Sequence, residues 1–358
     1  MALDIVVLLG SLGLILVGCE LFTNGVEWVG FVFALGEGVV GSVLAAVGTA
    51  MPETLIPVIA ILFASNAAGE EIGIGAILGA PFMLSTLAMF VTGTAVLIFS
   101  LRGRRSTDMK VNTTILRRDV SFFLVAYSVA IGAGFLPPSP FRVALALALV
   151  GMYGAYVLRQ LADEGEAGKD LNPLHFAKLR GSAPPEPVAK ELVAEISPIF
   201  HEVPVQTPGL AITLLQVAVG LVFIIGGARF FVGATENLAH LFGIPAVILA
   251  LIVAPVATEL PEKFNSVIWV RVRKDTLAIG NITGAMVFQS CIPTAIGISL
   301  TSWSITGTNV NAFVSAGIAI ASSIVIFGIM TLKSSLNARW LLVGGAWYAV
   351  YLAFLWLA

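Results

Sequence analysis

The chain has 358 residues, of which 58% are hydrophobic and only 11% are charged, with a formal net charge of -2 and a mean hydropathy of +0.98. Soluble domains average about 45–50% apolar and about 25% charged residues, so this composition excludes one or two water-soluble domains. We therefore expect an integral membrane protein.

The apolar segments predict membrane helices rather than a membrane barrel. A transmembrane β-barrel shows segments of about ten residues that alternate between apolar and polar, whereas residues 143–158 are apolar on every face. A helix needs about 20 apolar residues to cross the bilayer. Runs of this kind predict ten spans, at 4–23, 38–63, 72–100, 119–136, 141–159, 209–231, 244–268, 276–300, 310–331 and 339–357.

One polar stretch divides the chain. Residues 160–207 are rich in Pro, Glu and Ala, and all other breaks between the predicted spans are short. We therefore predict a first five-helix half at 1–159, a linker loop at 160–207 and a second five-helix half at 208–358.

The basic residues indicate which loops face the cytoplasm. Sixteen of the 19 Lys and Arg residues lie in four segments, at 102–118, 159–190, 271–274 and 333–339. All four fall on the same side when ten spans are threaded, and Lys and Arg collect on cytoplasmic loops. This predicts a multi-pass protein of the cell (inner) membrane with both termini outside and loop 160–207 in the cytoplasm.

The two halves resemble each other when one is shifted along the other by 209 positions. Equivalent pairs are Gly18 with Gly227, Thr49 with Thr258, Pro52 with Pro261, and Glu53 with Glu262. Further along, the Gly-rich runs 73–80 and 278–285 align at an offset of 205, and both predict close helix packing. Because each half has an odd number of spans, the second half is inverted relative to the first, an architecture typical of transporters. The predicted fold is an all-α polytopic membrane protein with about ten transmembrane helices in two inverted five-helix repeats.

Few ionisable side chains lie within the predicted spans, where each costs about 2.5–3.5 kcal/mol on insertion scales and so needs a reason. Excluding the span ends, they are Glu20, Glu53, Glu259, Glu262 and Lys263. Glu53 and Glu262 are the matched pair of the repeat, which makes them the leading candidates for a functional site.

A proline directly precedes each of these two glutamates. Pro52 and Pro261 lack an amide donor and thereby free helical carbonyls near Thr49 and Thr258. Carbonyls beside a carboxylate, contributed by two oppositely oriented helices, form an oxygen cage for a hard cation such as calcium, which takes six to eight oxygens. The alternative is a plain helix kink whose carboxylate is satisfied by another helix.

The segments GTAMPE (48–53) and ATELPE (257–262), each followed by a helix containing G-x-x-x-G, resemble the two alpha-repeats of the cation/calcium exchanger superfamily. The core pattern of those repeats is G-T-S-L-P-E. The resemblance implies antiport, usually of calcium against sodium or protons, through sites between the second, third, seventh and eighth helices. It assigns the two central acidic ligands to Glu53 and Glu262, and the threonines that contribute backbone carbonyls to Thr49 and Thr258.

The chain departs from that pattern at several oxygen ligands. The serine after the threonine is replaced by Ala50 and Glu259, the serines of the third and eighth helices by Ala80 and Ala285, and the following amide or acid by Leu84 and Gln289. Gln289 keeps a neutral oxygen, whereas Leu84 has none. Because these positions contribute to sodium sites in such exchangers, the departures favour protons over sodium as the coupling ion.

Glu259 and Lys263 are additions to the pattern and lie four residues apart, on one face of a helix. They form either a buried ion pair or a site at which Lys263 occupies a cation position or titrates during turnover. Together with Glu53 and Glu262 their formal charge is -2, which matches one divalent ion or two protons.

The sequence thus predicts a secondary active cation antiporter that exchanges Ca²⁺ for H⁺ or Na⁺ by alternating access around the paired glutamates. The candidate cation ligands are Glu53, Glu262, Thr49, Thr258, Glu259 and Gln289. An Na⁺/H⁺ or other cation antiporter would use the same carboxylates. An intramembrane enzyme is not favoured, since the spans hold no histidine, no H-E-x-x-H and no paired aspartates. We expect inorganic cations and the lipid bilayer as partners, no nucleic acid and no cofactor beyond the transported ions.

Overall fold

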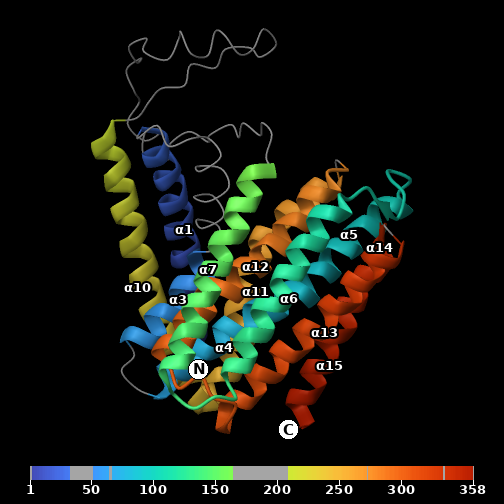
Figure 1. Cartoon of the computed structure of the whole chain (residues 1–358). Helices are drawn as coiled ribbons and strands as arrows, with labels where there is room; N and C mark the ends of the chain where they lie inside the picture. The colour runs from blue at the N-terminus through green and yellow to red at the C-terminus, as the bar shows by residue number, and fades with distance from the viewer. Residues whose placement is uncertain are drawn as a thin grey trace.

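The computed structural model describes residues 2–32, 51–63, 67–163, 209–271, 273–333 and 335–357, and these are mostly helical (Figure 1). Each predicted span corresponds to helix within the described residues, because long apolar runs in a membrane must satisfy their backbone groups internally. Seven of the described segments are long and apolar enough to cross a membrane. The predicted polytopic helical fold is confirmed. The predicted boundaries at 159 and 208 stay a prediction.

The first half contains α1 (Ala2–Val32), α3 (Met51–Phe63), α4 (Ala67–Met83), the π-helical turn η2 (Leu84–Ala88), α5 (Met89–Leu101), α6 (Thr113–Ala133) and α7 (Pro140–Asp163). The second half contains α10 (Leu210–Phe242), α11 (Ala246–Arg271), α12 (Asp275–Leu300), the 3₁₀ turn η3 (Gly307–Asn309), α13 (Val310–Lys333), α14 (Ala338–Leu341) and α15 (Val343–Leu357). The predicted span at 72–100 combines α4, η2 and α5.

The first helices of the two halves, α1 and α10, pack against each other along one side of the bundle (Figure 1). Their backbones touch, because a Cβ atom on Gly18 would lie only 2.9 Å from the carbonyl oxygen of Gly220. Beside this contact, the side-chain nitrogen of Gln216 donates to the carbonyl of Leu21 at 2.9 Å and to Oδ1 of Asn24 at 3.0 Å. Small residues and a buried amide therefore hold this pair together, as is usual between helices in lipid.

The Gly-rich run 73–80 brings α4 into contact with the backbone of α11. Cβ atoms on Gly75 and Gly79 would each lie 2.5 Å from a carbonyl oxygen, of Val247 and Leu251 respectively. The prediction of close packing is confirmed for this run. As a result α11, which carries the second glutamate motif, lies directly against α4.

The second Gly-rich run, 278–285 on α12, packs less tightly than predicted. The nearest atoms to Cβ positions on Gly280 and Gly284 are a methyl of Leu116 at 4.0 Å and the hydroxyl of Tyr156 at 3.7 Å, which are ordinary contacts. Helix α12 therefore faces α6 and α7 across side chains rather than backbone.

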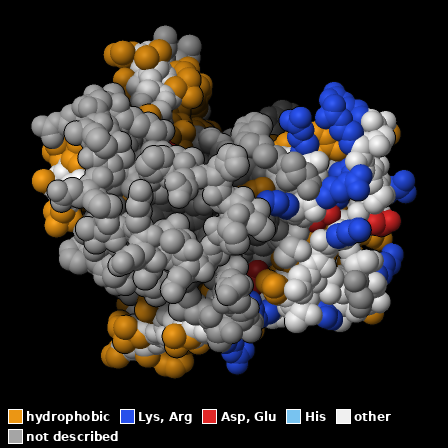
Figure 2. Space-filling model, turned by 90° about the horizontal axis from the view of Figure 1, so that it is seen from above, with side chains coloured by type: hydrophobic (Ala, Val, Ile, Leu, Met, Phe, Trp, Pro, Cys, Tyr) orange, Lys and Arg blue, Asp and Glu red, His pale blue; other side chains and the backbone are white. Residues whose placement is uncertain are grey.

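The basic segments gather at one end of the bundle, called here the basic end. Strand β1 (Asp108–Met109) pairs antiparallel with β2 (Leu336–Asn337), which joins the α5–α6 connection to the α13–α14 connection. Arg118, near the start of α6, also donates to the side chain of Gln160 near the end of α7. Figure 2 looks down on this end and shows Lys and Arg side chains around its described part. The prediction that these segments share one side is confirmed for the described residues; the strand pair was not predicted.

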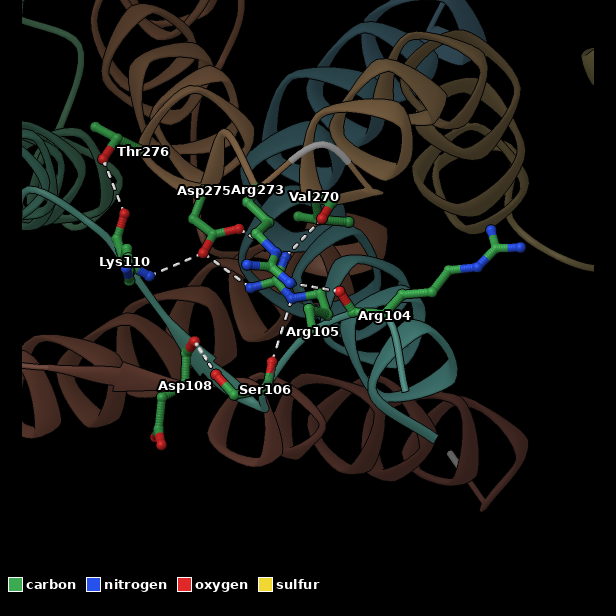
Figure 3. Close-up of polar contacts among 9 residues, drawn as sticks. All are labelled: Arg104, Arg105, Ser106, Asp108, Lys110, Val270, Arg273, Asp275 and Thr276. Carbon is green, nitrogen blue, oxygen red and sulfur yellow. Dashed lines mark hydrogen bonds and ion pairs between the residues drawn. The ribbon is translucent and has the colours of Figure 1, made fainter. Parts of the chain in front are cut away.

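A buried ion pair between Arg105 and Asp275 links the α5–α6 connection to the start of α12 (Figure 3). Two guanidinium nitrogens of Arg105 donate to the two carboxylate oxygens of Asp275 at 2.7 and 2.8 Å. Arg105 also donates to the carbonyl of Val270 at 2.6 Å, and the amide of Lys110 donates to Asp275 at 2.8 Å. Both side chains of the pair are almost fully buried, at 4% and 2% exposure.

The contact between α4 and α11 predicts the effect of one added methyl group. Gly79→Ala should lower the thermal unfolding temperature of the detergent-solubilised protein, because overpacking against backbone costs about 1–3 kcal/mol. Gly132→Ala on α6 is the matched control, since a Cβ there meets nothing within 4 Å and gains helix propensity. Equal stability of the two variants would contradict the close packing.

The Arg105–Asp275 pair predicts a second stability difference. Arg105→Gln should destabilise the basic end strongly, because removing one partner of a buried pair costs about 3–5 kcal/mol. Arg104→Gln is the control: the Arg104 side chain is exposed and points away from the pair (Figure 3). Thermal unfolding in detergent measures both, and a loss in Arg104→Gln as large as in Arg105→Gln would argue against the pair's role.

Candidate functional site

The candidate site is built around Glu53. This residue lies in the first turn of α3 as the structure describes it, and its side chain is only 5% exposed. The carbonyls near Thr49 that the sequence predicts to be free lie outside the described residues.

Gln289 of α12 reaches Glu53 from the other half of the chain. Its side-chain nitrogen donates to Oε1 of Glu53 at 3.1 Å, and its side chain is 1% exposed. Two candidate ligands that are 236 positions apart are thus in direct contact. The site joins the two halves of the repeat, which is where inverted-repeat transporters place their ion sites.

The second glutamate motif lies on α11, which is helical from Ala246 to Arg271 and therefore through Thr258, Glu259 and Glu262. The side chains of these residues and of Lys263 lie outside the described residues. Helix α11 itself packs against α3, α4 and α12, the elements that carry Glu53, the first Gly-rich run and Gln289. Pro261 has no N–H, so the carbonyl of Ala257 lacks the donor that a regular helix supplies.

The positions where the sequence lacks oxygen ligands are buried in the structure. Leu84 begins the π-helical turn η2 and is fully buried, and Ala80 is 2% exposed. The nearby hydroxyls of Ser85 and Thr86 donate back to the carbonyl of Phe82, at 3.1 and 2.5 Å. These bonds use the hydroxyl hydrogens and leave the oxygen lone pairs available, so the oxygens that the repeat pattern lacks here are those at Ala80 and Leu84 themselves.

Comparison with known proteins identifies the family. The model of the sodium/calcium exchanger protein family matches residues 3–162 and 212–358. The chain belongs to this family. It is a multi-pass membrane protein of a family of cation exchangers, and the resemblance drawn from the two glutamate motifs is confirmed.

Three relatives illustrate the similarity. The inner membrane protein YrbG of Escherichia coli (strain K12) is 22% identical over 264 residues, covering 73% of this chain and 68% of that protein. The crystal structure of the H⁺/Ca²⁺ exchanger CAX is similar with a TM-score of 0.67 and 15% identity, over 98% of this chain and 81% of that one. A structure of the sodium-calcium exchanger NCX_Mj gives a TM-score of 0.55 and 17% identity, over 98% of both chains. At these identities the two structures show a shared fold.

The exchanger also buries an acidic side chain that the sequence analysis missed. Asp119 of α6 is 2% exposed and accepts hydrogen bonds from the hydroxyls of Tyr156 at 3.2 Å and Thr283 at 2.8 Å. The predicted span began at 119, which made this residue look like a helix end. The helix begins two turns earlier at Thr113, where the side chain of Asn112 caps it.

The remaining ionisable residues within the predicted spans lie elsewhere. Glu20 on α1 and Arg229 on α10 are exposed side chains of the outer helix pair. Among the residues that the structure describes, no three His, Cys, Asp or Glu side chains form a metal-binding group. The contact between Glu53 and Gln289 is therefore the part of the predicted site that the geometry brings together.

This contact predicts the effect of removing the Gln289 amide. Gln289→Leu should weaken cation binding to the purified protein roughly 10-fold or more, because it removes the amide oxygen from the proposed ligand set, and a polar contact to a charge contributes about 1.5–3 kcal/mol. Ser290→Ala, next to it on α12, is the control, since its hydroxyl donates to the carbonyl of Val287 in the same helix. Calorimetric titration with Ca²⁺ measures both. Binding by Gln289→Leu at the strength of Ser290→Ala would remove Gln289 from the site.

Proposed function

We propose that this exchanger is a secondary active antiporter that moves Ca²⁺ in exchange for H⁺ or Na⁺ by alternating access around Glu53 and Glu262. The observation that supports this most directly is the buried hydrogen bond between Glu53 and Gln289, which joins the two inverted halves. A carboxylate and an amide are oxygen ligands that hard cations prefer. Thr49, Thr258 and Glu259 complete the proposed ligand set.

Charge compensation couples the two ion fluxes in this proposal. An ionised carboxylate cannot be transferred alone into a low-dielectric interior without a cost of many kcal/mol. Glu53 and Glu262 must therefore carry either the cation or protons whenever the site passes between the two sides. With Glu259 and Lys263 the formal charge is -2, so one Ca²⁺ or two protons balance it.

The apolar positions of the first half favour protons over sodium as the coupling ion. Leu84 and Ala80 are buried where the repeat pattern calls for oxygen ligands. A sodium ion would find fewer oxygens there, whereas a proton needs only a carboxylate. Of the two structural neighbours, CAX is an H⁺/Ca²⁺ exchanger and has the higher TM-score.

The arrangement of charge supports an orientation in the membrane. The basic end collects Lys and Arg from the connections that follow α5, α11 and α13 (Figure 2). Such an excess marks the cytoplasmic side. We therefore assign the basic end and loop 160–207 to the cytoplasm and both termini to the outside of the inner membrane.

An Na⁺/H⁺ antiporter, or an antiporter of another cation, is the second candidate. It would use the same two carboxylates and the same fold. Competition separates the two: in a calcium exchanger, external Ca²⁺ inhibits proton or sodium fluxes at low concentration, whereas in an Na⁺/H⁺ antiporter it does not.

The decisive experiment is ion flux in proteoliposomes. Ca²⁺ uptake should be driven by an imposed pH gradient, or by a sodium gradient, and Glu53→Gln should reduce it to the level of protein-free liposomes. Glu20→Gln is the matched control, because Glu20 is an exposed glutamate on α1, outside the site. The proposal fails if neither gradient moves Ca²⁺, or if Glu53→Gln transports as well as Glu20→Gln.

A further inference from the structure

Asp119 is held differently from the other buried acidic side chains of the described residues. Asp275 has its ion pair with Arg105, and Glu53 has the amide of Gln289. Asp119 instead accepts bonds from two neutral hydroxyls, those of Tyr156 on α7 and Thr283 on α12, and forms no salt bridge within the described part of the chain. An ionisable group in this position within a membrane bundle points to a function.

The cationic groups around Asp119 are engaged elsewhere. On α6 itself, Arg118 donates to Gln160, and on α7 the guanidinium of Arg159 lies over the ring of Phe122, 5.8 Å from its centre. The charged group of α12 on this side is Asp275, which is paired with Arg105. On α13, Lys333 lies over the ring of Trp340 at 4.9 Å. An ionised Asp119 is therefore stabilised by two hydroxyl dipoles and by the positive charge of the neighbouring Arg118, and it forms no salt bridge within the described residues.

We propose that Asp119, Tyr156 and Thr283 form a proton-binding site that is separate from Glu53. A metal ion does not fit this group, because its four oxygens fall short of the six to eight that calcium takes and both hydroxyls direct their hydrogens at the carboxylate. A proton needs one oxygen and one acceptor, and both are present.

The bonds of Thr283 show how the proton is accommodated. Its hydroxyl lies 2.8 Å from Oδ2 of Asp119 and 3.4 Å from the carbonyl of Gly280, so it has two acceptors within reach. When Oδ2 takes a proton from water, the new O–H donates to the Thr283 oxygen, and the Thr283 hydroxyl turns to the Gly280 carbonyl. The carboxylate charge is neutralised, and every hydrogen keeps an acceptor.

The location of Thr283 on α12 connects this site to Gln289. The two residues are six positions apart, which is about 9 Å along a helix. Protonation replaces a charge-assisted bond between α6 and α12 with a weaker neutral one. This weakens the attachment of α12, the helix whose Gln289 donates to Glu53. This consequence for exchange rests on the proposed antiport; the proton site itself does not.

Infrared difference spectroscopy of the purified full-length protein tests the site directly. Over roughly pH 3 to pH 9, a range that starts below the ordinary pKa of an aspartate, a titrating carboxyl band should appear in the wild type, persist in Glu53→Gln and vanish in Asp119→Asn. Tyr156→Phe removes a donor that favours the ionised form, so the midpoint should move up by about one pH unit. Tyr153→Phe is the control. The ring of Tyr153 stacks on that of Tyr156, with 6.2 Å between the ring centres, and the Asp119 carboxylate accepts its hydrogen bonds from Tyr156 and Thr283 instead.

Two results would overturn the site: the absence of any band that is sensitive to Asp119→Asn, or an equal shift in the two tyrosine variants. Liposome flux then tests the coupling. Asp119→Asn should retain exchange, but the exchange rate should depend less on pH in the alkaline range. An unchanged pH profile would overturn the link to exchange. Should no gradient drive transport in the wild type, the antiport proposal fails, while the infrared titration still decides the proton site.

Discussion

A buried negative charge must be compensated by a nearby cation or hydrogen-bond donor. In this protein helix α12 takes part in three such contacts: it donates to two buried carboxylates and carries a third, which an arginine pairs. Among the described residues, three of the polar links between α12 and the first half involve a buried carboxylate. From the basic end inward they are Asp275 with Arg105, Thr283 with Asp119, and Gln289 with Glu53. Each link would be costly to break, since an unpaired polar group in an apolar interior loses its solvation without replacement. These polar links add to the apolar core that α12 shares with its neighbours.

Helix α4 occupies the equivalent place in the other half and is held in a different way. Its glycines bring its backbone against the carbonyls of α11 with no space for a methyl group. Close packing of this kind depends on shape and is insensitive to pH or ion occupancy. The close backbone contact thus distinguishes α4, whereas α12 is distinguished by its links to buried carboxylates.

The sequence predicts most of this fold and part of the site, for physical reasons. Apolar length is a strong signal in a membrane, so the spans were found, and the glutamate motifs identified the family. Asp119 was missed because its span was started at 119, although Asn112 followed by two threonines is an N-cap pattern that places the helix start near 113. The pairing of Arg105 with Asp275 has no local signal, since it joins residues 170 positions apart.

The direction of the hydrogen bond at Glu53 adds a requirement to the exchange step. Gln289 presents its nitrogen to the carboxylate, and an N–H donor and a cation cannot share one lone pair of Oε1. A cation that binds Glu53 from this side must therefore displace the amide nitrogen. Rotation of the amide presents its oxygen to the cation and turns the former donor into a ligand. Because the amide belongs to α12 and the carboxylate to α3, in the proposed antiport a cation that binds Glu53 from this side changes the contact between the two halves, which is the contact that alternating access would break and reform.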